Sequence, residues 1–120
     1  MENKHVINKI SPENLNKKLE KDEDFILIDT LTSDHFRSVH IVNSKNACVF
    51  EVTFPEQVRN LVSEKNKTII LYGFSGKTMD AVTAAKKLLR AGYQDIYILD
   101  GGIMQWHKKD IKKYFLRVLK

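Results

Sequence analysis

The sequence predicts an α/β fold with a small central parallel sheet flanked by helices on both faces. Two short runs, Thr68–Tyr72 and residues 96–99, are almost wholly apolar, as strands covered on both faces must be. One helical segment separates them, so the three pieces form a strand, crossover helix and parallel strand, and such units are right-handed. A further apolar run at 25–29 adds a third strand to the same sheet.

The helix between the two central strands follows from the spacing of its apolar residues, which are Ala81, Val82, Ala85, Leu88 and Leu89. This spacing places them on one helical face, and basic residues take the other side. Gly92 stands where a glycine commonly ends a helix.

The amino-terminal part predicts one strand and one helix before the run at 25–29. Residues 6–10 are a short strand, and Ser11, followed by a proline and an acid, begins a helix that turns Leu15 inward. The run at 25–29 ends on Asp29. At the carboxyl end of a strand this carboxylate either acts chemically or braces a neighbouring loop by accepting backbone N–H groups.

The middle of the chain predicts a short helix within 30–39 capped by Ser33, a short strand at 43–49 and a helix at 54–62. His40 has no second histidine or cysteine at metal-ligand spacing, so we expect a structural role for it and no metal site.

The loop after the first central strand is the candidate binding site, because ligands of parallel α/β units lie at the carboxyl ends of the strands. Its backbone N–H groups, one lysine and two hydroxyls can hold a small anion such as thiosulfate, sulfate or phosphate. The residues of this predicted anion-binding loop are Phe74, Ser75, Gly76, Lys77, Thr78 and Met79. In the alternative, Gly76 only makes the tight turn and Ser75 or Thr78 only caps the helix.

The Gly-Lys-Thr triplet at 76–78 also suggests a nucleotide site, but its context argues against one. A phosphate-binding P-loop needs a glycine five positions before Gly76, and Leu71 stands there.

Composition bounds the remaining possibilities. The 120 residues are enough for a single domain, 1–120, and 42% hydrophobic with 29% charged residues is typical of a globular protein. No segment approaches the length of a transmembrane span, and the first residues lack a signal-peptide core. The one cysteine, Cys48, has apolar neighbours that favour a buried residue over a reactive thiol. We therefore expect a cytoplasmic protein.

The net charge is +5, and the basic residues are most concentrated in one segment. Segment 107–120 is basic, and a helical stripe of Ile111, Phe115, Val118 and Leu119 makes it amphipathic. It either contacts lipid or a partner or docks on its own domain. Elsewhere the bases are mixed with acids and lack interleaved aromatic residues, which argues against nucleic acid and membrane as partners.

Three segments together resemble the rhodanese homology domain. FILIDT followed by DHFRSVHI is similar to one family segment, KTIILYG resembles the strand that enters the active-site loop, and AGYQDIYILDGGIMQW is very similar to the family's carboxyl-terminal segment. The resemblance spans nearly the whole chain. It implies a rhodanese-like fold and a protein that requires no cofactor.

Catalytic members of that family carry a cysteine directly after the tyrosine of the strand, and its thiolate transfers sulfur from donors such as thiosulfate. Here Gly73 follows Tyr72, and if the longer loop is read as an insertion at the strand end, Ser75 takes the place of the cysteine. Neither residue can carry a persulfide, so the resemblance implies no catalytic residue in the loop. The leading hypothesis is therefore a non-catalytic anion-binding, regulatory or protein-interaction module.

Two alternatives remain. The chain could be an enzyme, either a sulfurtransferase that uses Cys48 or a phosphatase-like protein with a long loop, as in related cell-cycle phosphatases. It could also be a basic protein that binds lipid or nucleic acid through its carboxyl-terminal segment.

Overall fold

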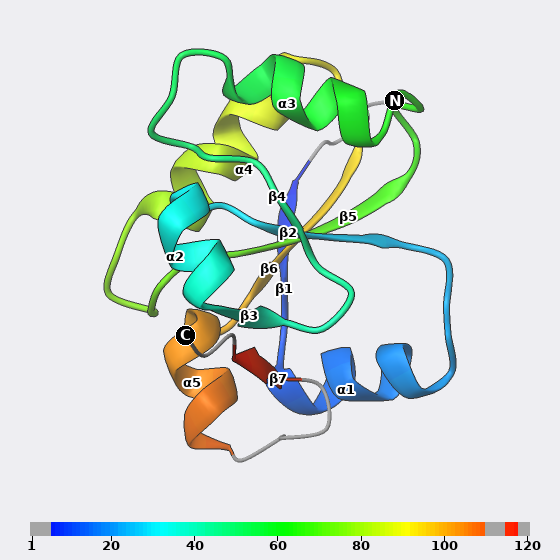
Figure 1. The fold of residues 1–120 in the computed structure, drawn as a ribbon. Helices are drawn as coiled ribbons and strands as arrows, with labels where there is room; N and C mark the ends of the chain where they lie inside the picture. The colour runs from blue at the N-terminus through cyan, green and yellow to red at the C-terminus, as the bar shows by residue number, and fades with distance from the viewer. Residues whose placement is uncertain (1–5, 110–114, 118–120) are drawn as a thin grey trace.

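The computed structural model describes residues 6–109 and 115–117 (Figure 1). Its centre is a sheet of five parallel strands in the order β1-β6-β5-β2-β4. In chain order these strands are β1 (Ile7–Ile10), β2 (Ile26–Asp29), β4 (Lys45–Asn46), β5 (Thr68–Tyr72) and β6 (Asp95–Leu99). The predicted parallel sheet is thus confirmed, and β5, which carries the candidate loop, lies at its centre.

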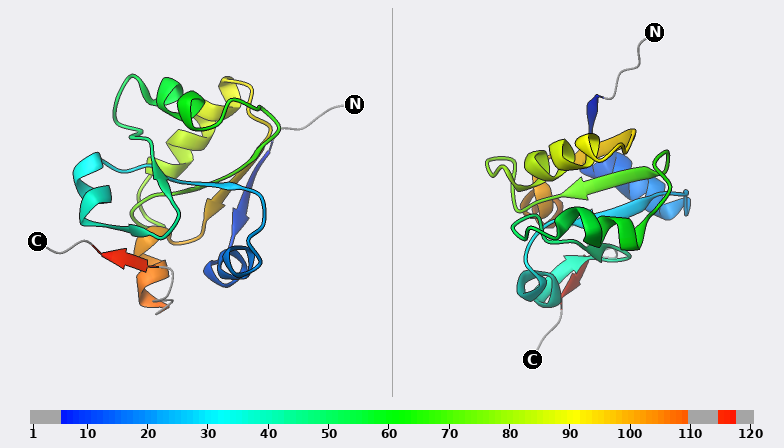
Figure 2. Two further views of the ribbon diagram at one scale, coloured as in Figure 1. Left: turned by 45° about the vertical axis from the view of Figure 1, so that its right-hand side comes forward. Right: turned by 90° about the horizontal axis from the view of Figure 1, so that it is seen from above.

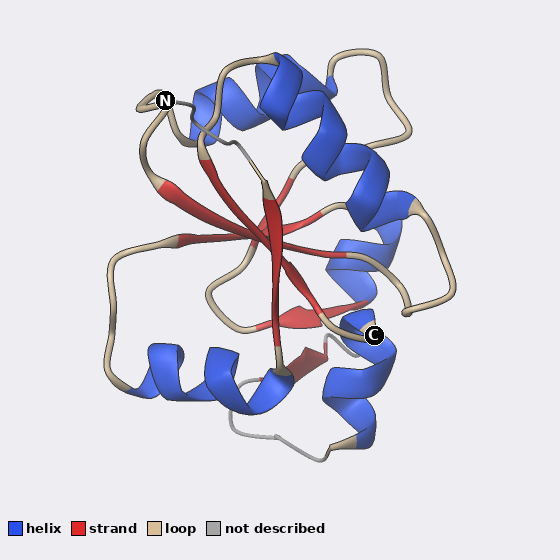
Figure 3. Cartoon of the chain, turned by 180° about the vertical axis from the view of Figure 1, so that it is seen from behind, coloured by secondary structure: helices blue, strands red, loops and turns tan. Residues whose placement is uncertain are grey.

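Helices cover both faces of this sheet, as the sequence predicts. Figure 3 shows helices on both sides of the strands, and the two core clusters group four of them into two pairs. One pair is α3 (Phe54–Leu61) and α4 (Asp80–Arg90), and the other is α1 (Pro12–Glu20) and α5 (Gly102–Lys108). Each of these four helices turns an apolar stripe to the sheet, because burying that stripe is its main source of stability.

The alternation of side chains along the strands divides the core into two clusters. In β5, Ile69 and Leu71 pack with α3 and α4, whereas Ile70 and Tyr72 pack with α1 and α5. All four side chains are fully buried. Burial of an aliphatic side chain contributes about 1.5–3 kcal/mol. Burial of alternate side chains on the two faces fixes the register of β5, and the register determines where the loop leaves the sheet.

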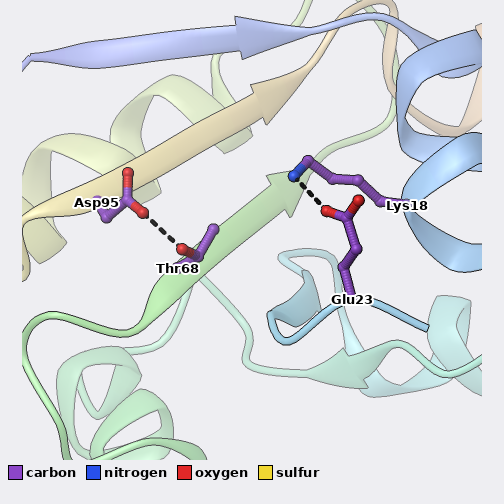
Figure 4. A network of polar contacts seen from close by, with 4 residues as sticks. All are labelled: Lys18, Glu23, Thr68 and Asp95. Carbon is purple, nitrogen blue, oxygen red and sulfur yellow. Dashed lines mark hydrogen bonds and ion pairs between the residues drawn. The ribbon is translucent and has the colours of Figure 1, made fainter. Parts of the chain in front are cut away.

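Two polar contacts, one between strands and one between a helix and a turn, are drawn in Figure 4. Thr68 Oγ1 donates to Asp95 Oδ2 over 2.5 Å at the start of β5 and β6. Lys18 Nζ lies 2.8 Å from Glu23 Oε1 and links α1 to the turn before β2. The hydrogen bond from Lys18 lowers the pKa of Glu23. The Thr68–Asp95 contact lies at the opposite end of β5 from the candidate loop.

Two predicted details in the middle of the chain differ in the structure. The cap of α2 (Ser33–Ser38) is Thr32, whose Oγ1 accepts the N–H of His35 over 3.2 Å, so Ser33 is already the first helical residue. The strand expected at 43–49 is present but shorter, since β4 covers only Lys45–Asn46, and beyond it the Ala47 N–H donates a backbone hydrogen bond to Asp29 O over 3.0 Å.

The carboxyl-terminal segment also departs from the prediction. Residues Phe115–Arg117 form strand β7, which pairs antiparallel with β3 (Val39–Ile41) in a separate two-stranded sheet (Figure 2). The helical stripe is therefore wrong at these positions, since pairing with β3 satisfies backbone groups that a helix would have paired internally. The other members of the stripe lie outside the described residues.

Within the described part of the chain, no helix is long and apolar enough to cross a membrane.

Candidate functional site

The candidate site is the loop of residues 73–79 between β5 and α4. In Figure 1 it lies on the same side of the molecule as α2 and the start of α5. Gly73 is buried, whereas Phe74 and the stretch 76–79 are exposed. The structure thus brings the predicted residues Phe74, Ser75, Gly76, Lys77, Thr78 and Met79 to one surface.

A carboxylate from the chain itself fills the inner side of this loop. Asp80 Oδ2 accepts the Phe74 N–H over 3.0 Å, and Oδ1 accepts the Ala81 N–H over 3.0 Å. The Thr78 hydroxyl donates to Oδ1 over 2.7 Å. The Asp80 side chain is only 8% exposed. These are the kinds of donors that the sequence analysis offered to an external anion, and Asp80 already uses them.

Asp80 is the residue that the sequence analysis missed. An acid in the first turn of a helix is a recognised signal, because the free N–H groups and the helix dipole favour negative charge there. That signal predicts stabilisation of α4. It does not predict that the carboxylate reaches back to Phe74.

Gly73 has no room for a side chain in this arrangement. A Cβ on residue 73 would lie 2.1 Å from Asp80 Oδ1 and 2.5 Å from Asp80 Cγ. Gly73 is also the position at which the sequence resemblance places the nucleophilic cysteine. A side chain there and the present position of Asp80 therefore exclude each other.

The start of the loop is also held by the first turn of α5. The Ile103 N–H donates to Gly73 O over 2.9 Å, and the Met104 N–H donates to Phe74 O over 3.0 Å. Gly102 makes this approach possible, because it has a φ of +64 and a Cβ there would lie 2.6 Å from Gly73 O. The loop backbone is thus anchored on both sides.

The predicted capping role of Ser75 or Thr78 is wrong. Helix α4 begins after Met79, which makes no side-chain cap hydrogen bond. Ser75 Oγ instead accepts the Lys77 N–H over 3.1 Å, and Thr78 Oγ1 accepts the Ser75 N–H over 3.3 Å. Both hydroxyls therefore fold the loop upon itself.

Beneath the loop lies a buried polar pair, Asp29 and Tyr72, in register at the ends of β2 and β5. Asp29 Oδ1 accepts the Leu31 N–H over 2.8 Å, and burial raises the pKa of this carboxyl. The Tyr72 hydroxyl accepts the Ile41 N–H over 3.1 Å and lies 3.1 Å from Ser44 Oγ. Burial and the Asp29 charge raise the pKa of Tyr72 well above its usual value. Of the two predicted roles of Asp29, its contacts are those of the structural brace.

Neither Cys48 nor His40 has the geometry of a reactive group. Cys48 is 3% exposed, and its N–H donates to Gln57 Oε1 over 2.9 Å. His40 Nδ1 lies 2.7 Å from Phe36 O, and its ring stacks on the Phe36 ring at 3.9 Å. Across the described residues, no group of three or more His, Cys, Asp or Glu side chains is placed to hold a metal ion.

Two grooves flank the loop. The first has a volume of about 580 Å³ and lies between the loop and α5, and the second, of about 440 Å³, lies between Met79 and the segment before α3. Phe74 and Met104 line the first, and Phe50 lines the second with Met79. These four apolar side chains are all more than 40% exposed.

Comparisons with known proteins bear on the family and the fold of this chain. The Rhodanese-like domain family matches residues 11–109. The uncharacterized protein YibN of Escherichia coli is 31% identical over 84 residues, which are 70% of this chain and 57% of that protein. The match thus spans just over half the length of this relative.

Solved structures share the fold. The BH2092 protein of Bacillus halodurans has a TM-score of 0.76 at 23% identity, over 86% of this chain and 73% of that chain. Thiosulfate sulfurtransferase of Pseudomonas aeruginosa has a TM-score of 0.79 at 14% identity, over 95% of this chain and 21% of that chain. With the family match over most of its length and the same sheet and helices, this chain belongs to the rhodanese-like domain family.

Proposed function

We propose that this chain is a rhodanese-like domain without sulfurtransferase activity that serves as a protein-interaction module. The observation that carries the proposal is the exclusion between Gly73 and Asp80, since a Cβ at residue 73 would lie 2.1 Å from the Asp80 carboxylate. Sulfur transfer in this family requires a thiolate at the loop. Here the same space holds a carboxylate, which cannot carry a sulfane sulfur.

The burial of Cys48 supports this proposal against the alternative of a sulfurtransferase that uses this residue. Cys48 is the one cysteine in the chain, and 3% exposure keeps its sulfur from a donor in solution. A phosphatase-like reaction is disfavoured for the same reason, because the related phosphatases also need the loop cysteine.

The occupied loop also favours a protein partner over a small anion. Thiosulfate, sulfate or phosphate would have to displace Asp80 from the Phe74 and Ala81 N–H groups. While Asp80 is ionised, the anion would also meet a like charge at short range. The exposed Phe74 and Met79, by contrast, offer apolar area of the kind that protein interfaces bury. We place the module in the cytoplasm, where a chain with one buried cysteine needs no disulfide.

Intact-mass analysis after incubation with thiosulfate, run beside a thiosulfate-to-cyanide assay, tests the lack of sulfur transfer. We expect no added sulfur and no turnover. A Cys48→Ala variant is the control, since it removes the thiol altogether and must behave as the wild type does. Addition of one sulfur atom to the wild type that is absent from Cys48→Ala would overturn the proposal and place the chemistry at Cys48.

A further inference from the structure

We propose that the groove between the loop and α5 binds an acidic peptide segment of a partner protein through one large apolar side chain. This inference rests on the proposed function and names the class of partner. The groove has a volume of about 580 Å³, which is enough for an aromatic or long aliphatic side chain.

The apolar part of the groove comes from two side chains on different elements. Phe74 on the loop is 41% exposed, and Met104 on α5 is 48% exposed. The Phe74 ring meets the ring of His35 edge-on, with centroids 5.9 Å apart, so it has a fixed support on α2. A rigid aromatic ring beside an adaptable methionine is a combination that interfaces use to receive an apolar anchor.

The charged part of the groove is entirely basic. Its charged lining residues are Lys77 and Lys108, and none of the described lining residues is an aspartate or glutamate. Both lysines are exposed, and the chain carries a net charge of +5. Charge complementarity therefore selects an acidic segment, because a basic one would meet like charge on both sides of its anchor.

The apolar and the basic lining residues together favour a peptide over two other classes of ligand, small anions and nucleic acid. A free small anion would use the lysines but leave Phe74 and Met104 exposed. Extended single-stranded nucleic acid is normally held by a track of basic residues with several aromatic rings, whereas Phe74 is the one Phe, Tyr or Trp among the described lining residues of this groove. An acidic peptide with one apolar anchor uses both kinds of lining residue.

A fluorescein-labelled short peptide with one central phenylalanine flanked by glutamates is the probe, and fluorescence anisotropy at low salt is the measurement. We expect saturable binding that Lys77→Glu combined with Lys108→Glu weakens by about tenfold or more. The matched control is Lys17→Glu combined with Lys86→Glu, which makes the same change in net charge at exposed lysines outside the groove. This control should shift binding by no more than about twofold, as expected for screened distant charges.

The apolar contact has its own pair of variants. Met104→Ser should weaken binding, whereas Val52→Ser, at a side chain that is 94% exposed and outside the groove, should not. A peptide with alanine in place of the phenylalanine should bind more weakly than the probe.

Three results would overturn the inference: no binding of the probe, equal binding of a peptide whose glutamates are replaced by lysines, or equal effects of the two pairs of charge reversals. Binding of single-stranded DNA or anionic vesicles that the groove variants abolish, without binding of the probe, would overturn it in favour of those ligands. The sulfur-transfer assay is independent of the anisotropy measurement, so a failed peptide test with no sulfur transfer removes only this inference.

Discussion

The Asp80 carboxylate occupies the space that a side chain on Gly73 would need. Its Oδ1 lies 2.1 Å from the position of a Cβ on residue 73. It also bonds the Ala81 N–H and the Thr78 hydroxyl, and its other oxygen bonds the Phe74 N–H. A side chain at residue 73 and the Asp80 carboxylate therefore compete for the same space, and a change at either residue is expected to act on the other.

Gly73→Cys alone should destabilise the chain and should not restore sulfur transfer. The new Cβ forces Asp80 out of its hydrogen bonds, so we expect the free energy of unfolding to fall by about 1–3 kcal/mol. Urea denaturation measures this loss. The substitution is best made with Cys48→Ala, so that any sulfur detected by mass belongs to residue 73.

Removal of the Asp80 carboxylate should allow a cysteine at residue 73 to take up sulfur. In Gly73→Cys combined with Asp80→Ala the thiol gains room, and the Phe74 and Ala81 N–H groups become free to stabilise a thiolate or persulfide. We expect one sulfur atom to be gained from thiosulfate by this double variant but not by Asp80→Ala alone. If Gly73→Cys without the second change is stable and takes up sulfur equally well, Asp80 is not the obstacle.

Gly102→Ala tests the close approach of α5 to the loop. Its Cβ would lie 2.6 Å from Gly73 O, and its φ of +64 is strained for any other residue. We expect a loss of about 1–3 kcal/mol in the free energy of unfolding. Gly76→Ala is the matched control in the same loop, because its Cβ would meet Gly101 Cα at an ordinary 3.5 Å. The control should change stability by less than about 1 kcal/mol, and similar losses in both variants would contradict this account.

Asp29 should make the stability depend on pH in a defined direction. Burial raises its folded pKa above the ordinary value of 3.8, so the folded state holds the proton more tightly than the unfolded state. As pH rises from about 3.8 through the folded pKa, the unfolded carboxyl ionises first and the free energy of unfolding falls. Above the folded pKa this penalty is constant.

Asp29→Asn isolates this effect, because asparagine keeps an oxygen that can accept the Leu31 N–H but does not ionise. The difference in free energy of unfolding, wild type minus variant, should be largest below about pH 3.8, where both states hold the proton, and should decline as pH rises. Urea denaturation over the acidic range measures it. A difference that does not change with pH would show that Asp29 does not titrate differently in the two states.

The sheet and its helices could be predicted because their signals are local. Apolar runs mark β2, β5 and β6, and the helical spacing of Ala81, Ala85 and Leu88 marks α4. Gly92, with a φ of +100, stands just past the end of that helix as expected. Each of these signals depends only on residues near one another in the sequence.

The position of the candidate site could be predicted from the sequence, but its occupation by the Asp80 carboxylate could not. The loop after β5 follows from the order of the elements, whereas the contact of Asp80 with Gly73 depends on how α4 enters the core. Strand β7 shows the same limit, because the spacing of residues 115–119 indicates a helix and only the distant partner β3 explains a strand.

Strand β7 provides the last prediction. Deletion of residues 115–120 removes the partner of β3, whereas deletion of 118–120 leaves it. Because the five-stranded sheet contains neither strand, we expect the larger deletion to lower the urea midpoint while unfolding remains cooperative, and the smaller deletion to have little effect. If the larger deletion leaves stability unchanged but abolishes salt-sensitive binding to anionic vesicles or nucleic acid, the segment acts as a basic surface ligand rather than as part of the fold.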